Sequence, residues 1–333
     1  MMKKTVSFFI LFFLSLILVL NAGCNGLPQT NLPDIPSEPE EFYQSSVHSD
    51  SENRFYFVDG TLFKQNRNTK VKTAIFQLKS DQVIDDFYFT GSYVYFVLRS
   101  QDNQDDSFSI CRIDENGKNF SVLLDDSFLM PEDDWEGKFV HALAAAEDHL
   151  VIQMTFSLYV HDMTTGQTVK ISPDAQQMEV SGGKLYYLSE FSVVERNVKS
   201  EQEKVILQSA YNDMDREQSN HLCSSFIFIN GVMFYCQRLP YGLYRYVNGI
   251  SNAVYEGKGI DEYCLTQYGE NLYFVVTDAT QSGLYRYDPK KDALALIQYL
   301  PNYKFNGGDK ILDGVFYYHN HMGWVETIPL SSD

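Results

Sequence analysis

Two neighbouring segments, Asn230-Gly-Val-Met-Phe-Tyr and Gly242-Leu-Tyr-Arg-Tyr, decide the fold of this chain. The Asn-Gly pair is a strong signal for a tight β-hairpin, because both residues accept a positive φ. The aromatic and β-branched residues that follow favour strands. The five residues of the second segment recur unchanged at 283–287. Together the two segments predict a pair of adjoining strands that the chain repeats.

This two-strand unit occurs seven times. The first strand opens with a turn residue and carries aromatic residues, and its copies begin at positions 52, 91, 147, 182, 230, 270 and 313. The second strand opens with a small residue, and its copies begin at 61, 109, 157, 192, 242, 283 and 323. Successive copies of the second strand lie 35 to 50 residues apart. This matches a propeller blade of about 40–50 residues and exceeds a solenoid coil of about 20.

The strands are apolar on both faces, as in Lys184-Leu-Tyr-Tyr-Leu and Leu272-Tyr-Phe-Val-Val. A barrel strand would alternate apolar with polar residues, and a parallel sheet would need crossover helices. The only helical candidates, 140–147 and 207–218, are short. We therefore predict an all-β fold, a β-propeller of four-stranded antiparallel blades over residues 42–333. Seven blades fit best, six or eight remain open, and the seventh blade shows no obvious fourth strand.

The composition of the chain excludes two classes of binding partner. The chain has 333 residues, a formal net charge of −18 and 15% aromatic residues. An acidic chain lacks the basic footprint that nucleic acid requires, so we expect no nucleic-acid partner. It is equally unsuited to electrostatic docking on an anionic membrane surface.

The first 41 residues predict export and anchoring. Met1-Met-Lys-Lys precedes an apolar run from Val6 to Leu20 that is shorter than the roughly 20 residues of a membrane span. Leu20-Asn-Ala-Gly-Cys then resembles a bacterial lipobox, although Asn21 stands where such signals carry an apolar residue. We expect cleavage between Gly23 and Cys24 and acylation of Cys24, with an ordinary cleaved signal or an uncleaved anchor as alternatives.

The predicted organisation has three parts. Residues 1–23 form a lipoprotein signal peptide, 24–41 a proline-rich tether and 42–333 the propeller. Four prolines within 25–41 favour an extended, semi-rigid spacer. Two or three acyl chains hold a protein firmly on a membrane. We expect a monomer anchored to a bacterial cell membrane and facing away from the cytoplasm.

The repeats resemble those of bacterial lipoprotein propellers of unknown function, which look similar to the propeller of low-density-lipoprotein-receptor-related proteins. The resemblance covers about residues 42–330 and rests on the Gly/Asn turn, the aromatic pair and strands such as Gly283-Leu-Tyr-Arg-Tyr-Asp. The chain lacks the Tyr-Trp-Thr-Asp motif, the Trp-Asp blade ending and regular kelch double glycines. The resemblance implies the fold and a binding role, and it carries over no catalytic residue.

No catalytic signature is present in the sequence. Nucleophile elbows, phosphate loops, dinucleotide-binding turns and His-Glu-x-x-His helices are all missing. We therefore predict no catalytic residue, no resident metal and no cofactor. His319 and His321 could share a metal but are more simply solvated, and the acids at 102–106 and 125–136 fit no known calcium loop.

Two insertions, at 125–137 and 209–221, interrupt the repeat period. Long loops on a repeat scaffold often carry function. Trp135, which follows Asp133 and Asp134, could stack on a sugar or contact a basic partner, or it could cap the edge of a blade. We name these three residues as the candidate binding loop.

Four cysteines follow Cys24: Cys111, Cys223, Cys236 and Cys264. A two-residue turn at Asn230-Gly231 places Cys236 opposite Ser225 rather than Cys223, which is poor disulfide geometry. We expect four buried thiols, with a bridge from Cys264 to the fifth blade as the alternative.

The leading hypothesis is a membrane-anchored lipoprotein whose propeller binds a protein, peptide or glycan without catalysis. The alternatives are an extracytoplasmic hydrolase or lyase with converging carboxylates or histidines in the propeller channel, and an envelope-assembly scaffold.

Overall fold

A computed structural model describes most of the chain after residue 44. It covers 45–49, 52–89, 92–101, 107–129, 139–209, 222–238, 240–257, 259–261, 265–277, 281–304, 309–312, 314–322 and 325–330. All of these residues lie in one compact unit, Glu40–Asp333.

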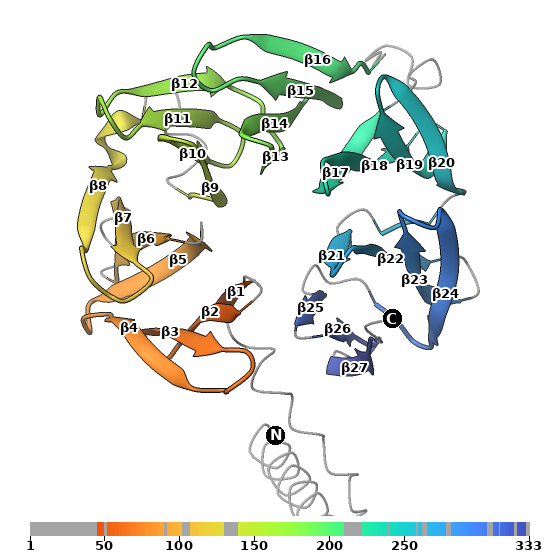
Figure 1. Cartoon of the computed structure of the whole chain (residues 1–333), viewed down its shortest axis with the longest axis horizontal. Coiled ribbons are helices and arrows are strands. Elements are labelled where there is room, and N and C mark those ends of the chain that lie inside the picture. The colour runs from red at the N-terminus through yellow and green to blue at the C-terminus, as the bar shows by residue number, and fades with distance from the viewer. Residues whose placement is uncertain are drawn as a thin grey trace, which may run out of the picture. The chain divides into compact units, whose positions relative to one another are not determined.

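Seven antiparallel sheets follow one another around a ring (Figure 1). The first three blades consist of β1 (Ser45–Ser49), β2 (Asn53–Val58), β3 (Thr61–Asn66) and β4 (Lys72–Gln77); β5 (Gln82–Phe89), β6 (Tyr93–Ser100), β7 (Phe108–Asp114) and β8 (Ser121–Asp125); and β9 (Ala142–Ala146), β10 (His149–Gln153), β11 (Leu158–Asp162) and β12 (Thr168–Ser172). A 3₁₀ turn, η2 (Asp126–Phe128), follows β8.

The remaining four blades complete the ring. They consist of β13 (Gln177–Ser181), β14 (Lys184–Ser189), β15 (Ser192–Arg196) and β16 (Glu203–Leu207); β17 (Cys223–Ile229), β18 (Val232–Arg238), β19 (Tyr241–Val247) and β20 (Ile250–Glu256); β21 (Thr266–Tyr268), β22 (Asn271–Thr277), β23 (Ser282–Asp288) and β24 (Ala293–Leu300); and β25 (Lys310–Leu312), β26 (Val315–His319) and β27 (Val325–Pro329).

The prediction of an all-β, seven-bladed propeller is confirmed. The two strands of each sequence repeat are the second and third strands of a blade; for example, the repeat at 230 and 242 gives β18 and β19. Blade 7 has three strands among the described residues, as its sequence suggested. The helical candidate at 140–147 is instead the strand β9, the innermost of blade 3.

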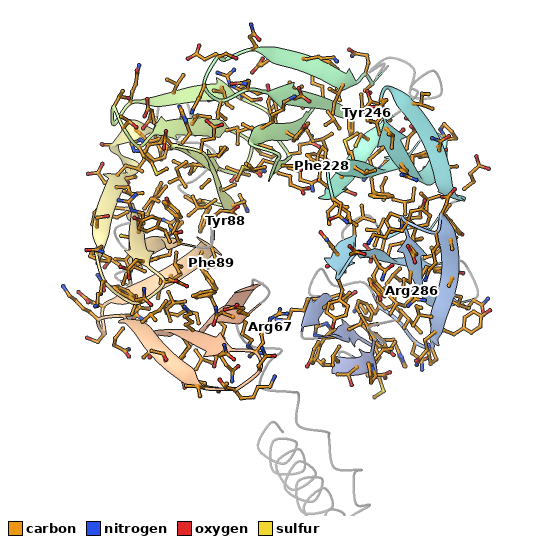
Figure 2. The ribbon with its side chains drawn as sticks, viewed as in Figure 1. Arg67, Tyr88, Phe89, Phe228, Tyr246 and Arg286 are labelled. Carbon is orange, nitrogen blue, oxygen red and sulfur yellow. The ribbon has the colours of Figure 1, made fainter. Side chains whose placement is uncertain are left out.

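Each strand pair packs on both neighbouring blades, and the alternation of its side chains explains how. In β18, Met233 and Tyr235 belong to the hydrophobic cluster shared with blade 4. Phe234 and Cys236 belong to the cluster shared with blade 6. Successive residues of a strand point to opposite faces of its sheet, so a blade between two others needs apolar residues at every position. Figure 2 shows side chains filling the spaces between successive sheets.

Six such clusters join the seven blades in chain order, from blades 1 and 2 to blades 6 and 7. Within the described residues, no comparable cluster joins blade 7 to blade 1. No helix in this part of the chain is long and apolar enough to cross a membrane.

Side chains of β13 also bridge to the neighbouring inner strand β17. Gln177 accepts a hydrogen bond from the Phe226 N–H at 3.0 Å and donates one to the Phe226 carbonyl at 2.7 Å. Both oxygens of Glu179 lie 3.0 Å from the Phe228 nitrogen, which donates to them. The two side chains thereby occupy backbone groups that an edge strand would leave unpaired. Burial raises the pKa of Glu179 to about 7, against the lowering effect of the Phe228 hydrogen bond.

Glu179 predicts a pH-dependent stability. Its carboxyl binds a proton more tightly in the folded state than in the unfolded state. The stability that this proton binding contributes is therefore fully present below the unfolded pKa near 4.5 and is lost as the pH rises to about 7. We expect Glu179→Gln, which keeps one acceptor for Phe228, to gain stability above pH 7, up to about 3 kcal/mol. The gain should vanish near pH 4.5. Urea unfolding across this range measures it.

The exposed Glu256→Gln on β20 is the matched control, because it removes the same charge from a solvated site. If the stability of Glu179→Gln and of the wild-type chain changed in parallel with pH, the raised pKa of Glu179 would be contradicted.

Candidate functional site

Several residues singled out from the sequence lie outside the described residues. They are Gly23 and Cys24, the acids at 102–106, Cys264, and the candidate binding loop of Asp133, Asp134 and Trp135. Asp125, at the base of that insertion, has a local role: it caps η2 by accepting the Ser127 N–H at 3.1 Å. Hydrogen bonds from Ser127 hold the pKa of Asp125 below its ordinary value.

The two histidines lie in different local structures. β26 ends at His319, and His321 follows in an exposed turn, so the two do not share a strand face as the sequence suggested. The His319 N–H donates to Asp309 at 3.4 Å. No group of three potential metal-ligating side chains occurs among the residues that the structure describes.

Three of the cysteines are buried thiols: Cys111, Cys223 and Cys236. The predicted register is confirmed, since Ser225 lies opposite Cys236 and a bulge follows toward Cys223. Burial raises the pKa of the Cys111 thiol to about 11, so it stays protonated and unreactive.

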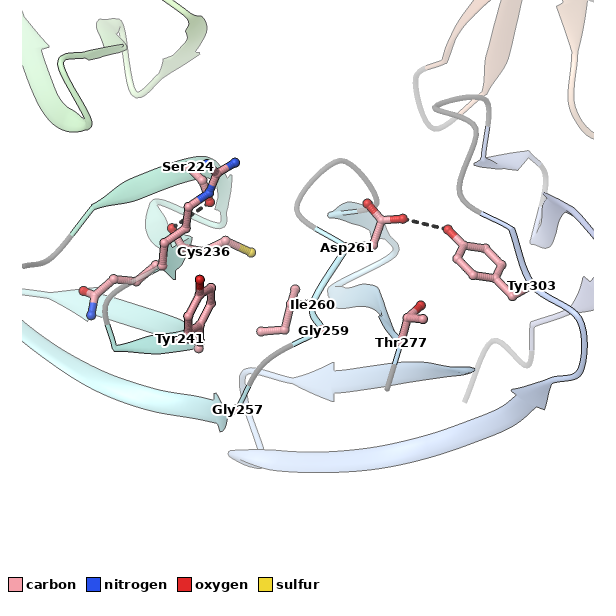
Figure 3. A pocket seen from close by; sticks show the side chains of 12 residues that line it. Ser224, Cys236, Tyr241, Gly257, Gly259, Ile260, Asp261, Thr277 and Tyr303 are labelled. Atoms are coloured by element: carbon pink, nitrogen blue, oxygen red, sulfur yellow. Dashed lines mark hydrogen bonds between the residues drawn. The ribbon is translucent and has the colours of Figure 1, made fainter. Parts of the chain in front are cut away.

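A cavity of about 390 Å³ lies between blades 5 and 6 (Figure 3). Its volume is typical of a site for a small ligand or the end of a larger one. It opens on the ring face that carries the β18–β19 and β22–β23 turns and the β20–β21 and β24–β25 connections. It is lined by Ser224, Cys236, Gln237, Arg238, Tyr241, Gly242, Gly257, Gly259, Ile260, Asp261, Thr277 and Tyr303.

Four described residues of the β20–β21 connection line the cavity: Gly257, Gly259, Ile260 and Asp261. The Gly257 N–H donates to the Tyr241 carbonyl at 3.0 Å, on the blade 5 side. On the blade 6 side, the Thr277 N–H donates to the Gly259 carbonyl at 2.6 Å, and Ile260 pairs with Val276 in an isolated β-bridge. The connection is therefore tied to both walls of the cavity.

Gly259 lies at a position of this connection that requires glycine. Its φ is +92°, and a Cβ there would lie 1.9 Å from the Thr277 carbonyl oxygen. The backbone of Gly259 therefore approaches β22 more closely than any side chain permits, and this approach places Ile260 and Asp261 against the cavity.

An acidic arrangement lies at the blade 6 side of the cavity. The Tyr303 hydroxyl is 2.8 Å from Asp261 Oδ2 and 2.5 Å from Asp309 Oδ2. One phenolic O–H donates fully to only one carboxylate at a time. A second proton, shared between Tyr303 and Asp309, would let both carboxyl groups hydrogen-bond to the hydroxyl. Burial raises the pKa of Asp309, and the nearby charge of Asp261 raises it further; the hydrogen bonds from Tyr303 and the His319 backbone oppose this.

Sequence reasoning did not identify Asp261, Tyr303 or Asp309. They lie in the connections that precede β21 and β25, nearly 50 residues apart, and no motif joins them. The available signal was Gly257-Lys-Gly-Ile-Asp, because two glycines beside an acid mark a close backbone approach in a blade connection.

Comparison with known proteins supports the fold. No protein-family model and no curated protein matches the chain, so the resemblance to lipoprotein propellers remains a prediction. Among solved structures, an oligogalacturonate lyase in complex with manganese superposes with a TM-score of 0.51 at 11% identity, over 71% of this chain and 74% of that one. The oligogalacturonate lyase of Vibrio parahaemolyticus gives 0.52 at 9% identity, over 73% and 76%.

Dipeptidyl peptidase 4 of Porphyromonas gingivalis gives a TM-score of 0.54 at 11% identity, over 87% of this chain and 53% of that one. The chain thus spans about half the length of that peptidase. At these identities, the likeness shows the shared propeller fold alone.

The Gly259 geometry predicts a large effect of a small change. Gly259→Ala should destabilise the chain by at least about 3 kcal/mol, because it adds a backbone clash to the cost of a positive φ. Gly249→Ala is the matched control: its φ is +83°, but a Cβ there meets nothing within 4 Å. Its expected cost is about 1–2 kcal/mol. Urea unfolding compares the two, and equal losses would contradict the close approach at Gly259.

Proposed function

We propose that the chain is a lipid-anchored, extracytoplasmic protein whose propeller binds the end of a peptide or glycan without catalysis. The observation that carries this proposal is the cavity between blades 5 and 6, with its mixed apolar and polar lining. Apolar pockets with a few converging polar groups are the usual form of a ligand site. The anchor rests on the predicted signal and acylation of Cys24, which would place a monomer on the outer side of a bacterial cell membrane.

A ring of packed blades suits binding at this face. The walls of the cavity come from different blades, and the apolar cluster between blades 5 and 6 lies directly against it, with Cys236 belonging to both. The lining groups are therefore held on rigid strands or on a connection tied to them. A preorganised site loses little conformational entropy when a ligand binds.

A hydrolase or lyase is the second candidate, favoured by one specific observation. Asp261 and Asp309 both contact the Tyr303 hydroxyl, and the pKa of Asp309 is raised. Carboxyl groups with displaced pKa values can exchange protons with a substrate. The Asp309 carboxyl contacts Tyr303 but does not belong to the cavity lining, so we give the binding role precedence.

Ligand binding is tested with the detergent-solubilised full chain on peptide and glycan arrays. Tyr241 is 42% exposed and lines the cavity, so Tyr241→Ala should weaken binding of the retained ligand about tenfold, as expected when a tyrosine that contacts a ligand is truncated. The control is Tyr299→Ala on β24, which removes a ring that is 52% exposed and lies outside the cavity lining.

Equal affinity of Tyr241→Ala and the wild-type chain would contradict binding at this cavity. Turnover of a retained ligand, lost in Tyr303→Phe, would instead favour the enzyme.

Anchoring is tested by labelling cells with an alkyne analogue of palmitate. We expect the wild-type chain to carry the label and to sediment with membranes, and Cys24→Ala to lose the label, because only a thiol at the lipobox accepts diacylglycerol. Asn25→Ala, next in the chain, should keep it. Label retained in Cys24→Ala, or an unlabelled wild-type chain, would contradict the proposal.

A further inference from the structure

We propose that the hydrogen bond between Tyr303 and Asp261 is a proton-dependent latch on the cavity between blades 5 and 6, closed while the Asp309 carboxyl holds a proton and open once that proton is lost. This inference rests on the proposed function, because it assigns a regulation by pH to the binding of a ligand in the same cavity.

The latch joins two separate segments of the chain. Asp261 belongs to the β20–β21 connection, whereas Tyr303 and Asp309 belong to the β24–β25 connection. Asp261 and Tyr303 both line the cavity, and the dashed line in Figure 3 marks their hydrogen bond. The Tyr303 hydroxyl lies 2.8 Å from Asp261 Oδ2 and 2.5 Å from Asp309 Oδ2. A change at Asp309 therefore reaches the cavity wall through one hydroxyl group.

The two contacts of that hydroxyl need two protons. Each lies within the distance of an O–H···O hydrogen bond, a phenol supplies one O–H, and an ionised carboxylate only accepts. When Asp309 is protonated, its O–H donates to the Tyr303 oxygen and the Tyr303 O–H donates to Asp261, so both contacts carry a proton. This count concerns the two oxygen–oxygen contacts alone, and it holds whatever further contacts Asp261 and Tyr303 make.

Loss of the Asp309 proton leaves one of the two contacts without a hydrogen bond. The contact of Tyr303 with Asp309 is the shorter one and lies within one connection, so Tyr303 keeps its hydrogen bond to Asp309. Asp261 loses its hydrogen bond to Tyr303, and the like charges of the two acids repel each other. The backbone of Asp261 stays in place, because its N–H donates to the Val275 carbonyl at 2.9 Å. Opening the latch therefore displaces the Asp261 side chain.

The surroundings of Asp309 set the pH at which the latch opens. Burial raises the pKa of Asp309 above its ordinary value of 3.8, and the charge of Asp261 raises it further. The hydrogen bonds from Tyr303 and from the His319 N–H on β26 oppose this, as does the charge of the His319 ring. Burial lowers the pKa of Lys310, the next residue. The latch is thus closed at acidic pH and opens as the pH rises through the raised pKa of Asp309.

A closed latch favours ligand binding. Asp261 and Tyr303 then hold each other in one arrangement, and a preorganised wall loses less conformational freedom when a ligand binds. After opening, the ligand has to order both side chains, so its affinity falls. In the proposed extracytoplasmic location the cavity meets the pH of the surroundings. The chain therefore holds its ligand in acidic surroundings and releases it as the pH rises.

The test follows the methyl groups of Ile260, which lies beside Asp261 in the cavity lining (Figure 3). The full chain in detergent, isotope-labelled at its isoleucine methyl groups, is titrated by NMR from about pH 4 to about pH 8, and Ile260→Val assigns the resonance. We expect a single titration step of Ile260 in the wild-type chain, because the wall has one arrangement with the latch closed and another with it open.

Two variants should fix the ends of that titration. In Asp309→Asn, the amide can donate to Tyr303 and accept the His319 N–H, as the protonated acid does. Its Ile260 resonance should stay at the low-pH position. Tyr303→Phe has no hydroxyl for the latch, so its resonance should not titrate and should lie near the high-pH position. If Asp309→Asn fails to fold, the comparison of Tyr303→Phe with the wild-type chain still decides.

The matched control is Asp292→Asn in the same blade. It removes a carboxyl that contacts the hydroxyl of a tyrosine, Tyr287, and lies outside the cavity lining. It should keep the wild-type titration of Ile260. An Ile260 resonance that does not titrate in the wild-type chain would overturn the inference. A titration that persists in Asp309→Asn would also overturn it, since that variant retains His319.

The second measurement uses the ligand retained by the arrays and weakened by Tyr241→Ala. Calorimetry at the two ends of the same pH range should give an affinity about fivefold or more higher at the acidic end for the wild-type chain, and equal affinities for Asp309→Asn. Equal affinities for the wild-type chain would overturn the inference and leave the proposed binding function standing. Titration of Ile260 without any array ligand would overturn the proposed function and, with it, the regulatory role of the latch.

Discussion

The structure depends on the apolar contact between the faces of successive blades. A blade is a small sheet that would be marginal alone. Here the second strand of every blade has three or more consecutive buried residues. The alternation in β18, with Met233 and Tyr235 toward blade 4 and Phe234 and Cys236 toward blade 6, shows the principle. The same contact fixes the distance between blades, and so it sets the width of the cavity that lies between two of them.

The architecture could be predicted from the sequence because this packing leaves a periodic record. Aromatic residues beside turn residues recur at blade spacing, and the register around Asn230-Gly231 follows from the turn alone. The candidate site left no such record. Asp261 and Tyr303 belong to connections from different blades, and they meet because the ring brings those connections together at one face. A cluster of residues that are close in sequence, such as Asp133 and Trp135, is visible in the sequence itself. The residues of this site come together only when the blades pack against one another.

The site also shows how one connection in a repeat protein can carry a local feature of its own. Every blade must send a connection from its outer strand to the inner strand of the next blade. In the connection before β21, Gly259 lets the backbone meet the Thr277 carbonyl, and Ile260 pairs with Val276. The repeat of strands continues past this point, while the connection brings a carboxylate to the wall of a cavity.

Six apolar clusters join successive blades of this chain. Cys236 belongs both to the cluster between blades 5 and 6 and to the lining of the cavity. A substitution that alters the packing of this interface therefore also alters the wall of the cavity. The stability of the fold and the shape of the site cannot vary independently at this position.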